Sequence, residues 1–237
     1  MKKNYILSTL FLIICGCSSL EMEPLSSSND EVQRILALGL THDENLIEAS
    51  KLSSPHMIAV VTTQLNKVYS DKSLAVANLE ESVIFADNVK VSNNNSKFVS
   101  KEMQFTETAV LLVNPDQITY FIEGTKNPAS NSFKHSLKTS IKYTSSERRE
   151  YTSVNFCDKW QGCDASDKID LKLLSSAASN CNSDVCDYTE KMETVLSSTL
   201  LDKNSQDGFT LRFNSKKETT KLQVTSAYLM GYLSVAK

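Results

Sequence analysis

The spacing of hydrophobic positions divides this chain into a helical first part and a strand-rich second part. Val32, Ile35 and Leu36 follow one another at helical intervals, and Ser28-Asn29-Asp30-Glu31 before them can cap a helix. Thr41-His42-Asp43-Glu44 has the pattern of a capping box and predicts a second helical start. We expect this second helix to end at Pro55, because proline interrupts a helical hydrogen-bond ladder.

A third helix is predicted over residues 57–69, and residues 72–81 could continue it. Its apolar positions recur three and four residues apart, at Ile58, Val61, Leu65 and Val68. From about residue 83 the pattern becomes typical of strands. The β-rich runs are VIFADNVKV, FVSKEMQF, TAVLLV, ITYFIEG, IDLKLL, YTEKMETVL and FTLRF.

Two turns predict hairpins in the second part. Asn114-Pro115-Asp116 separates TAVLLV from ITYFIEG, and Ser145-Ser146-Glu147 separates HSLKTSIKY from RREYTSVNF. In HSLKTSIKY the apolar face contains Leu137, Ile141 and Tyr143. Residues 225–235 predict a C-terminal helix, or a strand if Gly231 acts as a breaker.

These patterns predict an α+β protein. Its main part is a predominantly antiparallel β domain, sandwich-like or a meander, with short helices in the N-terminal part and a helix at the C-terminus. We expect four segments: an export signal at 1–16, a tether at 17–29, a helical part at 30–82 and a disulfide-stapled β-rich domain at 83–237.

The first seventeen residues carry the most specific motif. Lys2 and Lys3 precede the low-polarity run YILSTLFLII, which Ile14-Cys15-Gly16-Cys17 closes. That run is shorter than the roughly 20 apolar residues that a membrane-spanning helix needs, and it has the order of an export signal. The ending resembles the lipobox of bacterial lipoproteins. The resemblance implies lipid attachment at Cys17, cleavage before it, and anchoring of the protein in a membrane.

The same resemblance predicts a location. Aspartate after the lipidated cysteine often retains Gram-negative lipoproteins in the inner membrane, and Ser18 occupies that place here. It therefore implies a periplasm-facing lipoprotein of the outer membrane, with the inner membrane or a Gram-positive surface as alternatives. An ordinary secretory signal that leaves a soluble protein is the other interpretation.

Charge argues against a nucleic-acid partner. Without residues 1–16, Lys2 and Lys3 are lost, so 23 basic residues face 28 acidic ones and the formal net charge is −5. A phosphate backbone attracts basic surfaces, so we expect no nucleic-acid binding.

Four cysteines remain once Cys15 is removed with the export signal and Cys17 carries lipid. Their even number in an exported chain predicts disulfides, and the spacing favours Cys157 with Cys163 and Cys181 with Cys186. The crossed pairing, Cys157–Cys186 with Cys163–Cys181, stays open, as does a four-thiolate zinc site. The usual Cys-x2-Cys spacing of zinc sites is absent, so we expect no metal and no cofactor.

No catalytic motif stands out, and we expect no enzyme. His42, His56 and His135 are scattered and are interpreted as surface or capping residues, and the oxygen-rich stretch 202–208 as a turn. Trp160, inside the Cys157–Cys163 loop, is a candidate contact for an envelope protein partner, although packing on the disulfide is the simpler interpretation.

The sequence therefore predicts a lipid-anchored binding or scaffolding module of the periplasm. Two alternatives are a hydrolase of cell-envelope polymers, with its site assembled from separate strands, and an accessory lipoprotein of a secretion or pilus machine.

Overall fold

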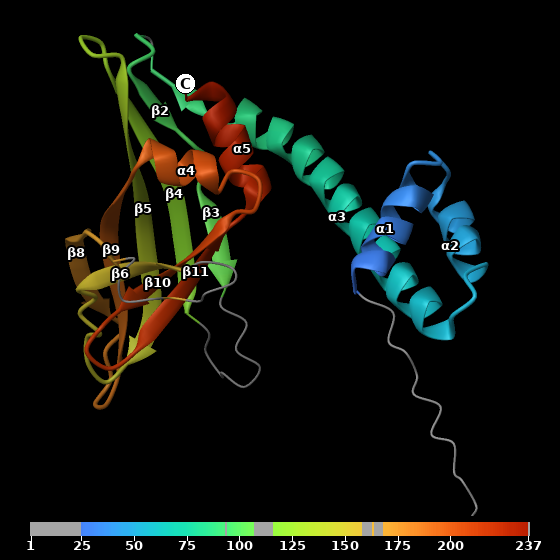
Figure 1. Cartoon of the computed structure of the whole chain (residues 1–237). Coiled ribbons are helices and arrows are strands. Elements are labelled where there is room, and N and C mark those ends of the chain that lie inside the picture. Colours follow the sequence, from blue (N-terminus) through green and yellow to red (C-terminus); the bar gives the residue numbers. More distant parts are fainter. Residues whose placement is uncertain (1–24, 93, 107–115, 158–162, 164–167, 237) are drawn as a thin grey trace, which may run out of the picture. The chain divides into compact units, whose positions relative to one another are not determined.

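The computed structural model describes residues 25–92, 94–106, 116–157, 163 and 168–236 (Figure 1). Its helices are α1 (Leu25–Leu36), α2 (His42–Ser50), α3 (Pro55–Asp87), α4 (Ser198–Lys203) and α5 (Ser226–Val235). Its strands are β1 (Lys90–Val91), β2 (Lys97–Val99), β3 (Met103–Thr106), β4 (Gln117–Asn127), β5 (Ser132–Ser145), β6 (Ser153–Cys157), β7 (Lys168–Ile169), β8 (Leu171–Ser179), β9 (Cys186–Leu196), β10 (Phe209–Asn214) and β11 (Thr219–Val224). The architecture is α+β with antiparallel sheets, as the sequence predicts.

Two compact units divide the chain within α3, after Asp71. The first unit packs α1, α2 and the beginning of α3 around a small core made of Val32, Ile35, Ala49, Met57, Val61 and Leu65. The predicted capping box is present: the backbone N–H of Thr41 donates to the Glu44 carboxylate at 2.9 Å, and the Glu44 N–H donates back to the Thr41 hydroxyl at 3.4 Å.

Helix α1 begins earlier than the predicted tether allows. The segment from Leu25 to Asn29 was expected to belong to a tether over residues 17–29, yet it forms the first turns of α1. Ser28 is only 2% exposed, and the Ser27 hydroxyl lies 4.0 Å from the Met57 sulfur. Packing within the first unit therefore outweighs the low helix propensity of this serine-rich stretch.

The second unit contains two antiparallel sheets. Seven strands form sheet A, in which β1, β2, β4, β5, β9 and β8 follow one another and β3 also pairs with β4; sheet B has the order β11, β10, β6, β7. One hydrophobic core includes side chains of both sheets and of α5. Leu137, Ile141 and Tyr143 of β5 face this core together, as their period-two spacing predicts.

The predicted hairpin around residues 145–147 is wrong. β5 pairs with β4 and β9, whereas β6 pairs with β10 and β7 in the other sheet. Residues 145–147 therefore lie in a connection between two sheets. Both strands carry the expected alternation, but alternation specifies a face and not a partner strand. β5 instead forms a hairpin with the strand before it, β4, across residues 128–131. The predicted turn at Asn114-Pro115-Asp116, with its strand TAVLLV, lies almost wholly outside the described residues.

The strand predicted from residue 83 is also wrong over its first part. Residues 83–87 are the last turns of α3, which has 33 residues. Phe85 is 8% exposed and packs edge-on against Tyr228 of α5, with ring centroids 5.3 Å apart. Gly231 of α5 makes this close approach possible, since a Cβ there would lie 2.5 Å from the Ser82 carbonyl oxygen. This packing selects a helix for residues whose β-branched side chains also suit a strand.

Two local disulfides staple the second unit, Cys157–Cys163 and Cys181–Cys186. These are the pairings that the spacing favours, and the crossed arrangement is not the one adopted. The first bridge follows β6, and the second closes the turn between β8 and β9. The predicted C-terminal helix is confirmed as α5, with Thr225 as its N-cap.

Candidate functional site

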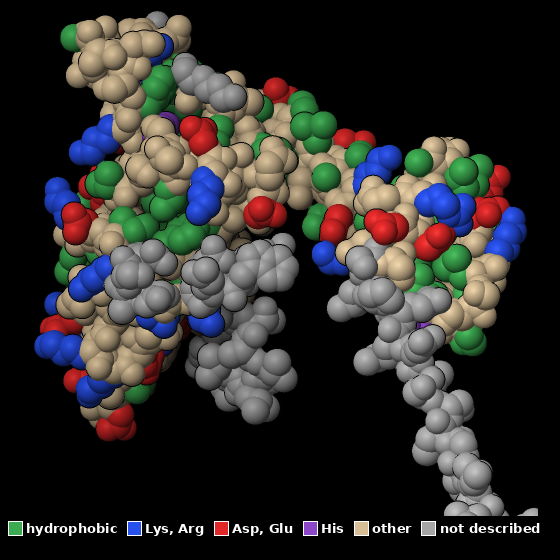
Figure 2. All heavy atoms as spheres, viewed as in Figure 1, with side chains coloured by type: hydrophobic (Ala, Val, Ile, Leu, Met, Phe, Trp, Pro, Cys, Tyr) green, Lys and Arg blue, Asp and Glu red, His purple; other side chains and the backbone are tan. Residues whose placement is uncertain are grey.

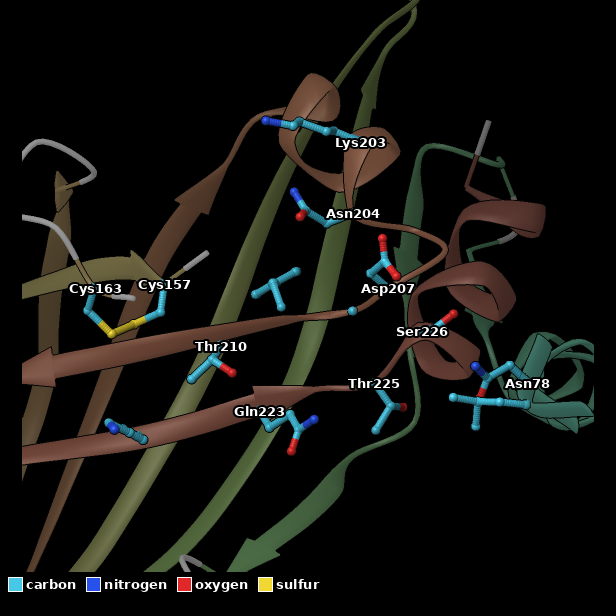
Figure 3. A pocket seen from close by; sticks show the side chains of 14 residues that line it. Asn78, Cys157, Cys163, Lys203, Asn204, Asp207, Thr210, Gln223, Thr225 and Ser226 are labelled. Atoms are coloured by element: carbon cyan, nitrogen blue, oxygen red, sulfur yellow. A yellow bond between two sulfur atoms is a disulfide. The ribbon is translucent and has the colours of Figure 1, made fainter. Parts of the chain in front are cut away.

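A groove of about 670 Å³ lies in the second unit at the start of β10 (Figure 3). Thr210 of β10 and Gln223 of β11 are directly opposite each other in the sheet, and both contribute to its lining. The remaining walls of the groove come from the Cys157–Cys163 disulfide, from Asn78 of α3 and from the end of α4. The groove is thus built by segments far apart in the sequence.

The outward face of sheet B forms part of this lining because its strands alternate. Phe209 and Leu211 are buried in the core, so Thr210 between them points to the other face. Gln223 lies in the same way between Leu222 and Val224. Within the part of the chain that the structure describes, the side chains of Thr210 and Gln223 make no hydrogen bond, so their donors and acceptors are available to a ligand.

The turn that leads into β10 shapes one side of the groove. Gly208 has φ = +71°, a left-handed conformation that favours glycine, and a Cβ there would lie 2.5 Å from the Val224 carbonyl oxygen. Ser226 ties the turn to α5, since its hydroxyl donates to the Ser205 carbonyl at 2.9 Å. Lys203 and Asp207 line this side and carry opposite charges. Lys221 also contributes to the lining, which therefore contains two lysines and one aspartate. Amide and hydroxyl groups share the groove with apolar side chains such as Leu74 and Phe209.

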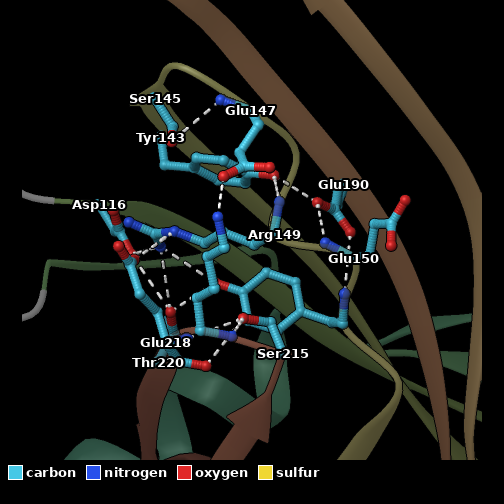
Figure 4. A network of polar contacts seen from close by, with 12 residues as sticks. Asp116, Tyr143, Ser145, Glu147, Arg149, Glu150, Glu190, Ser215, Glu218 and Thr220 are labelled. Carbon is cyan, nitrogen blue, oxygen red and sulfur yellow. Dashed lines mark hydrogen bonds and ion pairs between the residues drawn. The ribbon is translucent and has the colours of Figure 1, made fainter.

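A second polar centre joins the two sheets near the end of β5 (Figure 4). The Arg149 guanidinium forms an ion pair with Asp116, beside β4, and its Nε lies 2.7 Å from the Glu218 carboxylate, beside β11. Thr220 of β11 donates to the same Asp116 carboxylate at 3.2 Å, and the Tyr151 hydroxyl lies 2.5 Å from the Thr220 hydroxyl. The Arg149 network, as we call these five residues, ties sheet A to sheet B.

Glu190 supports the network from β9. It is 1% exposed, and its carboxylate accepts hydrogen bonds from the Tyr143 hydroxyl and from the backbone N–H groups of Glu150, at 3.2 Å, and Tyr151, at 3.3 Å. Burial raises the pKa of Tyr143 above its ordinary value. Burial alone would lower the pKa of Arg149, but hydrogen bonds to Asp116 and Tyr151 raise it overall.

The contacts of this second centre indicate a structural role. Both carboxylate oxygens of Glu190 accept hydrogen bonds from the chain itself, and the Arg149 guanidinium has carboxylate partners on two sides. A general base or an oxyanion donor must instead keep a group directed at a substrate. The groove, and not the Arg149 network, is therefore the better candidate for a functional site.

His135 was expected at the surface or in a helix cap, and this expectation is wrong, because it lies buried within β5. The side chain is 2% exposed in sheet A, and its Nδ1 lies 2.8 Å from the hydroxyl of Tyr232 in α5. Burial lowers the pKa of His135, and Asp202 opposes this effect. Gly124 leaves the space for this contact, because a Cβ there would lie 2.2 Å from the Tyr232 hydroxyl. His135 thus joins α5 to the sheet.

No family model, curated protein or solved structure matches this chain. Within the described residues, no three or more His, Cys, Asp or Glu side chains are grouped as a metal site would require. Among the helices formed by those residues, none has the length and hydrophobicity needed to cross a membrane.

The sequence-predicted site residues fall into two groups. Cys17 and Trp160 lie outside the described residues, so lipid attachment and the partner contact stay predictions. Cys157 and Cys163 lie at the groove, whereas Cys181 and Cys186 are at a different turn.

Sequence reasoning missed Thr210, Gln223 and Asn78 as groove residues, and it missed Arg149 as the centre of the network. Polar residues at alternate strand positions were visible in both strands of the groove. That signal is shared by every solvated strand face, so it could not mark a site.

Proposed function

We propose that this protein is a lipid-anchored binding module of the bacterial envelope, which faces the periplasm and uses the groove beside β10 to hold an envelope component. The observation that carries this proposal is the lining of the groove. Thr210 and Gln223 offer hydroxyl and amide groups side by side on two paired strands, and a disulfide borders them. Such a surface suits a polar, weakly charged polymer, such as a glycan strand or an extended peptide.

The location in this proposal rests on the resemblance of Ile14-Cys15-Gly16-Cys17 to a lipobox, with Ser18 favouring the outer membrane. Two or three acyl chains hold a protein firmly at a bilayer, since each buried CH2 contributes about 0.8 kcal/mol. A module tethered in this way stays close to the polymers beneath the membrane. A ligand that binds the groove only weakly is therefore present at a high effective concentration.

Photo-cross-linking in intact cells tests the groove. A photoreactive residue in place of Gln223 should give a discrete cross-linked product, and one in place of Lys142, exposed on β5 of sheet A, should not. Equal products from both positions, or none from Gln223, would contradict the proposal. Turnover of purified peptidoglycan by the wild-type chain, abolished by T210A or Q223A, would show an enzyme and would overturn the idea of a simple binding module.

A further inference from the structure

The outward face of sheet A is rich in lysine. Buried positions alternate along β4, β5 and β9, so the residues between them point away from the core that the two sheets share. Strand register places seven lysines on this outward side, which we call the lysine face: Lys90, Lys97, Lys134, Lys138, Lys142, Lys172 and Lys191. All of them except Lys138 are exposed. Figure 2 shows Lys and Arg side chains along the left margin of the second unit.

Carboxylates on this face are fewer than the lysines. In the strands that the structure describes, three acidic residues share the outward side: Glu123, Asp187 and Glu193. The Lys97 Nζ lies 2.9 Å from the Glu123 carboxylate, and the Lys138 Nζ lies 2.9 Å from that of Glu193. The lysine face therefore keeps an excess of positive charge after these pairs have formed.

Charged residues that flank the strands do not reverse this sign. Lys101-Glu102 follows β2 and Glu147-Arg148 follows β5, and each pair cancels in charge. Asp170 and Asp184, on either side of β8 along the chain, lower the excess and leave it positive. The chain without residues 1–16 has a formal net charge of −5, so basic residues are concentrated on this side of sheet A.

The lysine face is broad, and its basic residues are all lysines. Lys134 and Lys142 lie about 27 Å apart along β5, and the five neighbouring strands β2, β4, β5, β9 and β8 span about 19 Å. Arginine forms the planar, two-pronged contacts that grip a single phosphate, whereas lysine carries a hydrated point charge on a flexible stem. Such a face suits a wide, fluid surface that carries many negative charges.

The lysine face and the groove lie on opposite sides of the second unit. The groove includes the outward face of sheet B, and one core lies between the two sheets. A large molecule that covers the lysine face therefore leaves the groove open.

We propose that the lysine face lies against the anionic phospholipid headgroups of the membrane in which the protein is anchored. The membrane location is that of the proposed function, on which this inference rests. Cys17 lies eight residues before Leu25, where α1 begins, so even a fully extended chain keeps α1 within about 29 Å of the bilayer. The bilayer is thus a large anionic surface within reach, and this contact directs the groove away from it, toward the polymers of the periplasm.

Labelling of a reporter thiol tests the contact. Thr125 is exposed and pairs with Lys97 on one side and with Lys134 on the other, so T125C places a thiol on the lysine face. The full chain is reconstituted into vesicles of phosphatidylcholine, with or without phosphatidylglycerol. A water-soluble maleimide should label T125C several-fold more slowly where phosphatidylglycerol is present. The two rates should become equal at about 1 M salt, where the Debye length is about 3 Å.

Thr219, also exposed but on the outward face of sheet B, provides the matched control. T219C should be labelled at the same rate in both kinds of vesicle. Equal rates for T125C in the two kinds of vesicle would overturn the proposal. Slower labelling of T125C on addition of heparin, with no effect of phosphatidylglycerol, would assign the face to a soluble polyanion and would also overturn it.

Charge reversal in the T125C background tests the role of the lysines. K142E with K191E should abolish the difference between the two kinds of vesicle, since it reverses two exposed charges of the lysine face. K216E with K217E, in the turn between β10 and β11, changes the net charge equally and should preserve the difference. The same loss in both double variants would show a response to net charge alone and would contradict the proposal.

Flotation of the vesicles separates this inference from the lipid anchor. A chain that carries lipid floats with vesicles of either composition. A chain that floats only with phosphatidylglycerol vesicles, and does so through Lys142 and Lys191, would show that the anchor is wrong and that the lysine face is right. A chain that floats with both, with equal labelling of T125C, would show the reverse.

Discussion

Arg149 contacts Tyr143 twice: its guanidinium carbon lies 4.2 Å from the centre of the tyrosine ring, and its backbone N–H donates to the tyrosine hydroxyl at 2.8 Å. The side chain of Arg149 is 14% exposed, and that of its ion-pair partner Asp116 is 13% exposed. A guanidinium can stack on a ring and pair with a carboxylate at the same time, whereas a lysine ammonium cannot reproduce this geometry.

Replacing Arg149 should therefore destabilise the fold. R149M leaves the Asp116 carboxylate without its cationic partner, and we expect a loss of about 3–5 kcal/mol in the free energy of unfolding. R149K should recover only part of this loss. Denaturant unfolding followed by circular dichroism measures both. R148M, at the exposed neighbouring arginine, should change stability by less than about 0.5 kcal/mol. An equally small effect of R149M would show that the network does not hold the sheets together.

Helix α5 should tolerate no side chain at Gly231. The Cβ of G231A would lie 2.5 Å from the Ser82 carbonyl oxygen and 2.6 Å from the Phe85 Cβ, so α5 and the end of α3 must move apart. Such overpacking costs about 1–3 kcal/mol. The measurement is the midpoint of thermal unfolding, with S234A on the exposed side of α5 as the control. A midpoint for G231A equal to that of the control would contradict the close packing.

Stability should fall at mildly acidic pH because of His135. Burial lowers the pKa of this histidine below 6.5 in the folded chain, so the unfolded chain binds the proton more readily. The stability contributed by neutral His135 is therefore present above pH 6.5 and is lost progressively as the pH falls through 6.5 toward the lowered pKa.

We expect H135Q to remove this part of the pH dependence. Urea midpoints at several pH values between about 5 and 7.5 measure the slope, with H56Q, at an exposed histidine, as the control. A slope unchanged in H135Q and reduced in H56Q would refute the assignment.

The disulfide of the β8–β9 turn should contribute modestly to stability. Cys181 and Cys186 close a short loop at a turn, and the chain-entropy relation gives about 2 kcal/mol for a loop of this length. The double variant C181S with C186S should fold with its free energy of unfolding lowered by that amount. Mass spectrometry of a non-reduced digest should show both local pairs in the wild-type chain. Peptides that join Cys157 to Cys186 would contradict the pairing.

Lipid attachment should depend on Cys17 and not on Cys15. C17A should accumulate as an unprocessed precursor that incorporates no labelled palmitate, because the acceptor thiol is gone. C15A provides the matched control, since only Cys17 follows the small residue Gly16, and it should be processed and labelled normally. Normal processing of C17A would remove the basis for a lipid anchor.

Local patterns were sufficient for much of the fold. Thr41 and Glu44 predict their capping box because its hydrogen bonds join residues three apart, and Leu137, Ile141 and Tyr143 predict their shared face because strands alternate. The nearest-neighbour disulfides follow from spacing for the same reason: short loops close most readily.

The candidate site could not be predicted in this way. Thr210 and Gln223 face each other only because β10 pairs with β11, and the groove exists only because the Cys157–Cys163 bridge and α3 lie beside these strands. None of these groove residues belongs to a sequence motif that would mark it as functional.

The amino-acid order alone thus specified the helical and β-rich parts of the chain, the faces of its strands, its local disulfides and a predicted export signal. Tertiary structure decided the rest: β5 pairs with β4 and β9 rather than with β6, residues 83–87 are helical, and His135 is buried. The physical reason is that alternation and periodicity act over a few residues. Strand pairing, burial and the contact of Gly231 with α3 depend on segments that meet only after the chain has folded.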